Sequence, residues 1–252
     1  MDLIRRLRWE RKQEDSRRRQ SSLPEPSLSN DTNEGTSSPF RGLSPHPISL
    51  ETHRCPGPSE LFYIPDLISE EEESFLLRAV EIGDPWVQLK TRRLKCFDEG
   101  VAPPSWLSLL IESLVSKGVW DNPNEPPNHV LINDYLPGEG IMHHTDGPLY
   151  RDYVVILSLG SSAMMSFRAN LKTSEIGLKA QHDIAKVFLL PRSALIFLGE
   201  TYSDFLHGIE AITHDEFRED MGIVNLDALP STLRGTVARG RRVSLTIRRK
   251  LS

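Results

Sequence analysis

The sequence predicts a mainly β fold with supporting helices, an α+β domain in which two sheets stack. Short runs of β-branched and aliphatic residues recur between residues 130 and 248, and turns rich in Gly, Pro and Asn separate them. Two segments with helical spacing of apolar residues precede these runs. Because short strands separated by turns are typical of sandwiches and barrels, we expect a double-sheet architecture with helical support.

The amino-acid composition divides the chain into two parts. Of the 252 residues 38% are hydrophobic, which is low for a wholly globular chain. Residues 1–58 are rich in Ser, Pro, Asn, Arg and Glu and contain few aliphatic side chains. Such a segment cannot bury enough apolar surface to offset the entropy of ordering. We therefore predict a disordered polar and basic tail over residues 1–58 and one folded domain over residues 59–252.

The tail begins with arginine clusters at residues 5–8 and 17–19 that are interrupted by acidic residues. Three interpretations stay open: a solvated charged tail, a nuclear-localisation or nucleic-acid-tethering arm, and an organelle presequence. Glu10, Glu14 and Asp15 argue against the presequence, because such segments contain few acidic residues. We expect the protein in the cytoplasm and the nucleus.

Composition also excludes several protein classes. No apolar run approaches the roughly 20 residues that cross a bilayer, and the basic start does not match a secretory leader. Two cysteines, Cys55 and Cys96, are too few for a disulfide framework or a four-cysteine zinc site. The net charge of −5 gives no global case for nucleic-acid binding, although a local basic patch is compatible with it. We expect no membrane partner and a monomer.

The elements before residue 130 include two helices. Residues 61–64 form a strand-like run that Pro65 closes. Ser69 with Glu72 three residues later predicts a capped helix start, and apolar residues at helical spacing follow. Residues 86–99 alternate loosely and are basic. A second helix is predicted over residues 106–117, after two prolines.

From residue 130 onward the pattern predicts strands. The expected strands cover residues 130–135, 153–159, 163–168, 186–190, 193–198 and 243–248. Residues 169–185 and 210–236 are expected to be polar insertions between strands.

A metal-binding pattern follows the first of these strands. His144 and Asp146 form a His-x-Asp pair, and residues two apart on an extended strand project to the same face. With His207 as the third ligand, two histidines and one carboxylate would make the facial triad of non-haem iron oxygenases. A His-x-Asp pair alone also occurs by chance. The alternation favours His144 over His143, which we expect to face solvent or to support a ligand.

The last predicted strand alternates strictly. Its polar face carries Arg242, Ser244, Thr246 and Arg248. Because the guanidinium fork of arginine binds carboxylates bidentately, this face can line a cavity for a dicarboxylate. The alternative is an amphipathic strand with a solvated basic face.

The motifs together form a longer pattern. In chain order they are Asn133-x-Tyr135-x-Pro137-Gly138, His144-x-Asp146, Ser158-Leu159-Gly160, His207-Gly208-Ile209 and Arg242-x-Ser244-Leu245-Thr246-x-Arg248. This pattern resembles the AlkB family of Fe(II)/2-oxoglutarate dioxygenases over about residues 60 to 250. The joint pattern is far more specific than any of its pieces.

The resemblance implies a double-stranded β-helix (jelly-roll) oxygenase core that uses Fe(II), 2-oxoglutarate and O2. The Fe(II) ligands it implies are His144, Asp146 and His207. Arg242 would bind the distal carboxylate of 2-oxoglutarate, and Arg248 would lie near the metal-side carboxylate. The further cosubstrate contacts it implies are Asn133, Tyr135 and Ser244. The family reaction converts 2-oxoglutarate to succinate and CO2 and hydroxylates an N-methyl group, which then leaves as formaldehyde.

The substrate side is less specific. Arg92 and Arg93 lie where the family places its substrate-covering lid, so we predict that they contact a phosphate backbone. A solvated charged strand is the alternative. Tyr150 either lines the substrate pocket or is an ordinary buried tyrosine. DNA-repairing relatives carry an acidic residue two positions after the metal aspartate, where this chain has Pro148. Alkyl-base repair should therefore not be transferred to this protein.

Three functions remain open from the sequence. The first is oxidative demethylation of N-methylated nucleic acid, with RNA favoured over DNA. The second is a dioxygenase that acts on a protein side chain. The third is a jelly-roll module that binds RNA or protein without turnover.

Overall fold

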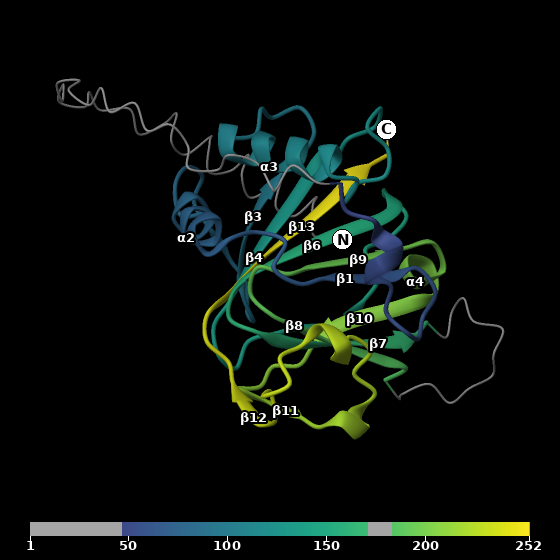
Figure 1. Ribbon diagram of the computed structural model, residues 1–252. Helices are drawn as coiled ribbons and strands as arrows, with labels where there is room; N and C mark the ends of the chain where they lie inside the picture. The colour runs from purple at the N-terminus through teal and green to yellow at the C-terminus, as the bar shows by residue number, and fades with distance from the viewer. Residues whose placement is uncertain (1–46, 171–182, 252) are drawn as a thin grey trace, which may run out of the picture. The chain divides into compact units, whose positions relative to one another are not determined.

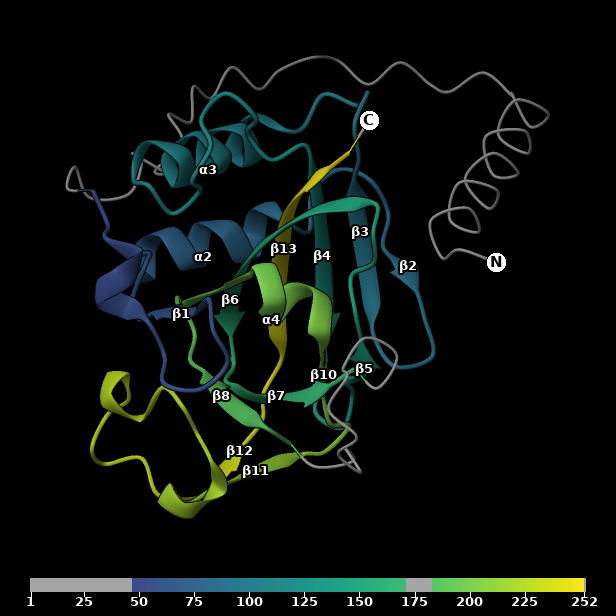
Figure 2. The same cartoon turned by 90° about the vertical axis from the view of Figure 1, so that its right-hand side faces the viewer.

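Antiparallel strands in two stacked sheets form the body of the protein (Figures 1 and 2). The structure is a computed structural model that describes residues 47–170 and 183–251. The strands are β1 (Leu61–Ile64), β2 (Val87–Gln88), β3 (Arg93–Phe97), β4 (His129–Tyr135), β5 (Ile141–His144), β6 (Tyr150–Gly160), β7 (Ala163–Ala169), β8 (Ala185–Leu189), β9 (Ala194–Leu198), β10 (Phe205–Ile209), β11 (His214–Phe217), β12 (Gly235–Ala238) and β13 (Arg242–Lys250).

The strand order confirms the predicted jelly roll. The large sheet has the order β1-β9-β6-β13-β4-β3-β2 and the small sheet has the order β5-β10-β7-β8. From β4 to β13 the chain crosses repeatedly between the sheets, with β4, β6, β9 and β13 in the large sheet and β5, β7, β8 and β10 in the small one. Eight strands that alternate in this way between two facing sheets form a jelly-roll core.

Two helices cover the outer face of the large sheet. They are α2 (Glu70–Ala79) and α3 (Ser105–Ser116), and a shorter helix, α4 (Gly199–Asp204), joins β9 to β10. The predicted cap is present, because Ser69 Oγ accepts from the Glu72 amide at 3.2 Å and the Ser69 amide donates to the Glu72 carboxylate at 2.7 Å. Leu107 and Leu110 of α3 belong to one apolar cluster with residues of β4 and β13 (Figure 2).

The strict alternation of β13 separates the two faces of the large sheet. Val243, Leu245 and Ile247 belong to the apolar cluster beneath the helices. Arg242 and Arg248 point to the other face, where they contact Ser158 and Asp146. β13 is therefore apolar toward the helices and polar toward the small sheet, whereas inner-face residues of β1, β6 and β9 pack with the small sheet in a second apolar cluster. The polar face of β13 is where a site can form.

The folded part of the chain begins earlier than residue 59. Most of the predicted tail lies outside the described residues, but residues 47–58 pack on the domain. The Ile48 amide donates to the Lys117 carbonyl at 2.8 Å, and Cys55 is buried. A short 3-10 helix covers Leu50–His53. Few apolar side chains suffice in residues 47–58 because neighbouring elements already supply a surface.

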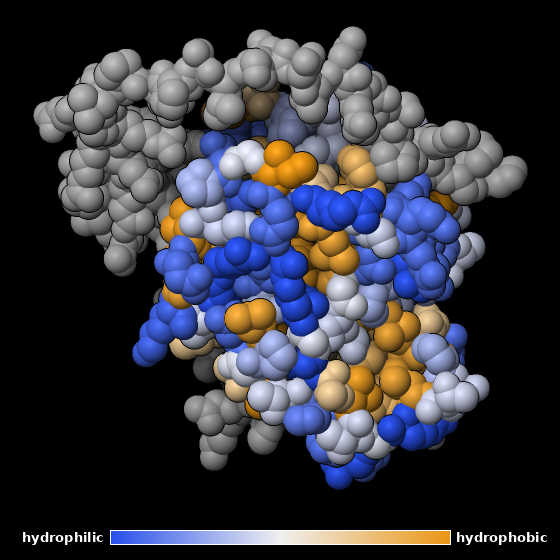
Figure 3. Space-filling view, turned by 90° about the vertical axis from the view of Figure 1, so that its left-hand side faces the viewer, coloured by the Kyte–Doolittle hydropathy of each residue, from blue (hydrophilic) through white to orange (hydrophobic). Residues whose placement is uncertain are grey.

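Residues 210–236 hold more structure than the expected polar insertion. β11 and β12 pair as a two-stranded sheet, and two 3-10 turns, Glu219–Met221 and Leu226–Ala228, lie between them in the chain. Phe217 and Ile223 pack with Phe188 in a small apolar cluster. On the face drawn in Figure 3, hydrophobic residues gather at the lower right, above hydrophilic residues at the bottom edge. Within the described part of the chain, no helix is long and apolar enough to span a membrane.

Candidate metal and cosubstrate site

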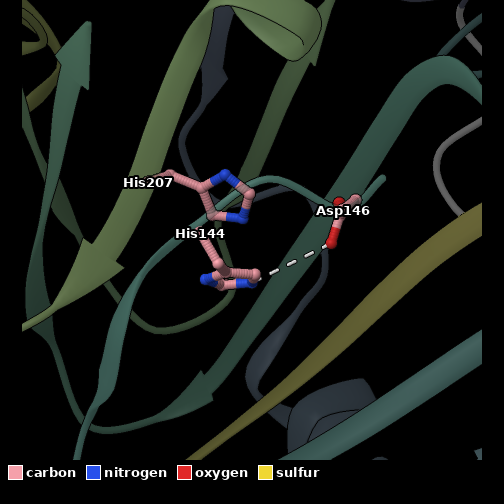
Figure 4. Close-up of side chains that lie close together, drawn as sticks. All are labelled: His144, Asp146 and His207. Carbon is pink, nitrogen blue, oxygen red and sulfur yellow. Dashed lines mark ion pairs between the residues drawn. The ribbon is translucent and has the colours of Figure 1, made fainter. Parts of the chain in front are cut away.

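Three side chains from the small sheet and the loop beyond it converge on one point (Figure 4). His144 ends β5, His207 lies in β10, and the register of the two strands sets these residues directly opposite each other. Asp146 follows two residues after His144. One ligand atom from each of the three side chains lies within 4.8 Å of the others. The predicted triad is thus brought together although His207 is far away in the sequence.

The hydrogen bond of His144 leaves its second ring nitrogen available. Nδ1 lies 2.9 Å from the carbonyl oxygen of Met142, and a carbonyl can only accept. Nδ1 therefore carries the proton, and Nε2 presents its lone pair 4.0 Å from the Asp146 carboxylate. A ring held in this way is oriented for binding a metal through Nε2.

Burial and charge set the protonation states that a metal ion requires. Burial lowers the pKa of His207 to about 4, so its imidazole is neutral at pH 7. For Asp146, burial raises the pKa, but the charge of Arg248 and the neighbouring histidines together outweigh burial and hold the carboxyl pKa below its usual value. Arg248 donates to Asp146 Oδ1 at 2.7 Å, and Oδ2 is buried without a protein partner.

These donors fit a divalent transition metal. Two neutral imidazoles and one carboxylate form the facial set that leaves open coordination positions. The unpartnered Oδ2 of Asp146 is an acceptor that a cation would satisfy, because buried polar atoms normally have a partner. Phe167 and Phe197 pack against the ring of His207, at centroid distances of 6.2 and 4.9 Å, and wall one side of the site.

His143 takes no part in this triad. Its Nε2 lies 2.8 Å from Ser166 Oγ, so the ring turns toward β7. Gly208 makes room for it, since a Cβ at that position would lie 2.9 Å from the His143 amide nitrogen and 3.0 Å from its Nδ1. The glycine that follows His207 therefore lets β5 approach β10 closely enough for His144 to meet His207.

Arg242 presents an anion-binding group on the large sheet. Its side chain is buried, and one terminal nitrogen donates to Ser158 Oγ at 2.9 Å while Nε has no partner. Among the described residues no carboxylate forms an ion pair with it, whereas neighbouring Arg239 is paired with Asp215 at 2.6 Å. Burial lowers the pKa of Arg242 to about 10. A buried cation of this kind fits the carboxylate of a ligand.

The other predicted cosubstrate residues share this face. In the pairing of β13 with β4, Arg242 lies opposite Tyr135 and Ser244 lies opposite Asn133. Asn133 and Ser244 are buried. A cavity here is lined by Tyr135, Leu136, Glu139, Ser162, Ala163, Ile209, Arg239, Gly240 and Arg242. The cavity adjoins two of the predicted cosubstrate residues, Tyr135 and Arg242, and none of the three metal-ligand candidates lines it.

The structure separates the three residues predicted to bind substrate. Arg92 donates from Nε to Asn133 Oδ1 at 2.8 Å, so it reaches the cosubstrate face. Arg93 points to the opposite, helix-covered face, where it pairs with Asp134 at 2.7 Å. This placement does not bring Arg93 to the site, because consecutive residues of a strand point to opposite faces. Tyr150 is buried, with its ring 4.0 Å from the guanidinium carbon of Arg248.

Sequence reasoning missed His129, which lies beside the triad. It is 1% exposed, and its two ring nitrogens lie 3.4 Å from Arg248 and 3.3 Å from the Tyr150 hydroxyl. Burial lowers its pKa to about 4. The alternation that places Asn133 and Tyr135 on the inner face also places His129 there, so the strand period could have found it.

Tyr202 of α4 is a second residue that the motifs did not indicate. Its hydroxyl donates to the Gly147 carbonyl at 2.6 Å, and so it holds the loop directly after Asp146.

Comparison with known proteins agrees with this site. A family model of the 2OG-Fe(II) oxygenase superfamily matches residues 86–248. The chain belongs to the 2OG-Fe(II) oxygenase superfamily. Membership implies Fe(II), 2-oxoglutarate and O2, and the triad and Arg242 provide groups that fit the metal and the cosubstrate carboxylate.

Curated relatives place the chain within the AlkB family. It is 34% identical over 204 residues to the "Probable RNA/DNA demethylase ALKBH6" of Danio rerio, an alignment that covers 76% of this chain and 86% of the relative. It is 29% identical over 219 residues to the "tRNA (carboxymethyluridine(34)-5-O)-methyltransferase ALKBH8" of Macaca fascicularis, covering 76% of this chain and 30% of that protein. The stretch 133–142 and the ending 242–249 also resemble AlkB homologue 6.

Solved structures resemble the chain more distantly. The structure of OsALKBH1 has a TM-score of 0.46 and 16% identity, and the match covers 75% of this chain and 98% of that chain. A prolyl-4-hydroxylase of Pseudomonas putida has a TM-score of 0.45 and 13% identity, with 77% and 95% coverage.

Proposed function

We propose that this protein is an Fe(II)- and 2-oxoglutarate-dependent demethylase of N-methylated nucleic acid, with RNA favoured over DNA. The observation that carries the proposal is the convergence of His144, Asp146 and His207 beside Arg248, which donates to Asp146 from the same strand, β13, that carries the buried Arg242. The relatives support the substrate class, since one is named a probable RNA/DNA demethylase and another a tRNA methyltransferase. We also propose a monomer located in cytoplasm and nucleus.

Different residues of the site bind the cosubstrate and orient the metal ligands. Arg242 binds the distal carboxylate of 2-oxoglutarate, and Arg248 keeps Asp146 ionised and oriented for the metal. Fe(II), once bound, supplies the oxygen chemistry that no side chain can perform. The protein contributes position, charge and an environment from which Phe167 and Phe197 exclude water.

A coupled assay tests the proposal. Wild type and His144→Ala are incubated with Fe(II) and 2-oxoglutarate and with matched methylated and unmethylated RNA, DNA and peptides, and succinate and formaldehyde are measured. We expect formaldehyde from wild type with methylated RNA and none from His144→Ala. His143→Ala is the control, because His143 contacts Ser166 and not the triad.

Other outcomes of the same assay would point elsewhere. Turnover on peptides alone would replace the nucleic-acid substrate with a protein side chain. No succinate from wild type, together with nucleic-acid or peptide binding that survives His207→Ala, would favour a module that binds without turnover.

A further inference from the structure

Arg92 connects a surface turn to the inner face of the large sheet. It lies between β2 and β3, and the turn is closed by a hydrogen bond from the Leu89 amide to the Arg92 carbonyl at 2.9 Å. From this turn the Arg92 Nε donates to the carboxamide Oδ1 of Asn133 in β4 at 2.8 Å. The hydrogen bond joins two residues that are 41 positions apart in the sequence, and the Arg92 side chain points toward the inner face and not into solvent.

This contact determines which end of the Asn133 carboxamide is available. A guanidinium has donors and no acceptor, so Arg92 can only engage the carboxamide oxygen. The NH2 group of Asn133 is then the free end, and within the described residues no other side-chain partner of Asn133 is found. Asn133 is 4% exposed and lies opposite Ser244, two residues along β4 from the pair of Tyr135 and Arg242 and on the same face.

The charge of Arg92 acts at the same place. Burial raises the pKa of Tyr135, and the positive charges of Arg242 and Arg92 oppose that rise. The contacts agree with this, since Arg92 donates to Asn133 and the Arg242 guanidinium carbon lies 5.8 Å from the Tyr135 ring centroid. Two cations and an NH2 group next to Tyr135 and Ser244 favour a ligand with negatively charged oxygens.

The neighbouring basic residues do not share this placement. Arg93 pairs with Asp134 at 2.7 Å and with Glu81 at 2.9 Å on the helix-covered face. Lys95 lies on that face too, where its Nζ donates to the Ile82 carbonyl at 3.2 Å. Lys90 is exposed in the same turn as Arg92. Arg92 is thus distinguished from its neighbours by a directed contact with an inner-face residue.

We infer that Arg92 is a positioning residue for 2-oxoglutarate, holding Asn133 with its NH2 group toward the cosubstrate. The inference rests on the proposed function of the site and goes beyond it. It also replaces the expectation that Arg92 contacts a nucleic-acid phosphate. Because Arg92 belongs to the β2–β3 turn, the position of that turn and the geometry of the cosubstrate site depend on the same hydrogen bond.

Calorimetric titration of 2-oxoglutarate into the full chain loaded with Mn(II) tests the inference without turnover. The variants are Arg92→Ala, Asn133→Ala, the double variant, Arg92→Lys and Lys90→Ala. Arg92→Ala should weaken 2-oxoglutarate binding about tenfold, as expected for one charge-assisted hydrogen bond. The double variant should bind no more weakly than Asn133→Ala, because the two residues act as one unit. Arg92→Lys, which keeps a donor and the charge, should recover part of the loss.

Turnover and folding measurements complete the design. In succinate formation, Arg92→Ala should raise KM for 2-oxoglutarate with little change in kcat, since Arg92 does not touch the reacting atoms. Lys90→Ala removes a charge from the same turn and should change affinity less than about twofold. Should Arg92→Ala lower the thermal unfolding temperature markedly, Arg92→Gln replaces it as the test.

The outcomes are distinguishable. Additive effects in the double variant, or an equal loss in Lys90→Ala, would overturn the positioning role. If wild type binds 2-oxoglutarate and Arg92→Ala binds it equally tightly, this inference is overturned and the proposed function is not affected. A Mn(II)-loaded wild type that binds no 2-oxoglutarate would overturn the proposed function and the inference together.

Discussion

His143 and His144 are adjacent in the chain, yet their side chains have different surroundings. His144 faces His207 across the β5–β10 pairing, with ring centroids 4.4 Å apart, whereas His143 turns toward Ser166. The difference follows from the alternation of a strand, because neighbouring residues point to opposite sides. Only one of two chemically identical side chains can therefore bind the metal.

Removing the imidazole of His144 should weaken metal binding strongly, whereas removing that of His143 should not. His144→Ala is expected to weaken Co(II) binding at least about 100-fold, since loss of a ligand exceeds the effect of losing a supporting residue. His143→Ala should stay within about tenfold of wild type. Titration of the two variants with Co(II), followed by visible absorption, measures both. Equal losses in the two variants would contradict the assignment.

His129 should make folding stability depend on pH. Its pKa is about 4 in the folded protein and about 6.5 in the unfolded chain, so the unfolded state binds a proton first as pH falls. Stability should therefore decrease from about pH 6.5 to about pH 4, by roughly 1.4 kcal/mol per pH unit from this residue. It should change no further below that range, where His129 is protonated in both states.

Urea unfolding of wild type and His129→Asn between pH 7 and pH 5 isolates this effect. The free energy of unfolding should fall less steeply with falling pH in the variant, because the variant lacks the proton that His129 takes up on unfolding. Because His207 also titrates below its usual pKa, the measured quantity is the difference between the two slopes. Identical slopes would show that His129 does not carry the dependence.

At the scale of elements, the metal site depends on how closely β5 approaches β10. Gly208 permits this approach, because a Cβ there would lie 2.9 Å from the His143 amide nitrogen and 3.0 Å from the Ile141 carbonyl oxygen. These are backbone atoms, so β5 itself would have to move. Displacing β5 would carry His144 away from His207, since both belong to the paired strands.

Gly208→Ala should therefore damage metal binding more than folding. We expect Co(II) affinity to fall by about tenfold or more, in the range seen when support of a ligand is lost. Thermal unfolding should shift by only a few degrees, equivalent to about 1–3 kcal/mol of overpacking. Gly240→Ala is the control, because its Cβ would meet only the Ser161 side chain, at 3.4 Å or more. Unchanged Co(II) affinity in Gly208→Ala would show that β5 can adjust.

At the scale of the whole molecule, Arg242 links stability to ligand binding. It is a buried cation in a sheet that otherwise supplies the core, and no carboxylate among the described residues neutralises it. Keeping such a group costs folding free energy that a bound anion would recover. The protein is therefore expected to be more stable with its cosubstrate than without it.

Arg242→Met should reverse this relation. Methionine is unbranched and apolar, so the ligand-free variant should be more stable than wild type by about 1 kcal/mol. Wild type loaded with Mn(II) should gain about 2.7 kcal/mol at a 2-oxoglutarate concentration of about 100 Kd, and the variant should gain nothing. Thermal unfolding with Mn(II) alone and with both ligands measures this. A 2-oxoglutarate-dependent gain in the variant would exclude Arg242 as the carboxylate partner.

The features that depend on local spacing could be predicted from the sequence alone. The cap at Ser69 and the alternation of residues 242–248 follow from helix and strand periodicity. The His144-x-Asp146 spacing indicated two ligands, although Asp146 lies in the loop beyond β5. The structure confirms the helix cap and the strand alternation, and it brings together the side chains that the motifs indicated. The packing of residues 47–58 was not predictable in this way, because their apolar partners come from distant elements.

The contacts that depend on the register between distant strands became known only from the folded structure. It placed His207 opposite His144, put His129 beside Arg248, and turned Arg92 and Arg93 to opposite faces of the large sheet. A one-residue shift in register would move every side chain of a strand to the other face of the sheet. The pattern of residues 90–95 alone does not show which of these side chains face the site. Strand period is a local property of the chain, whereas register depends on partners far away in sequence.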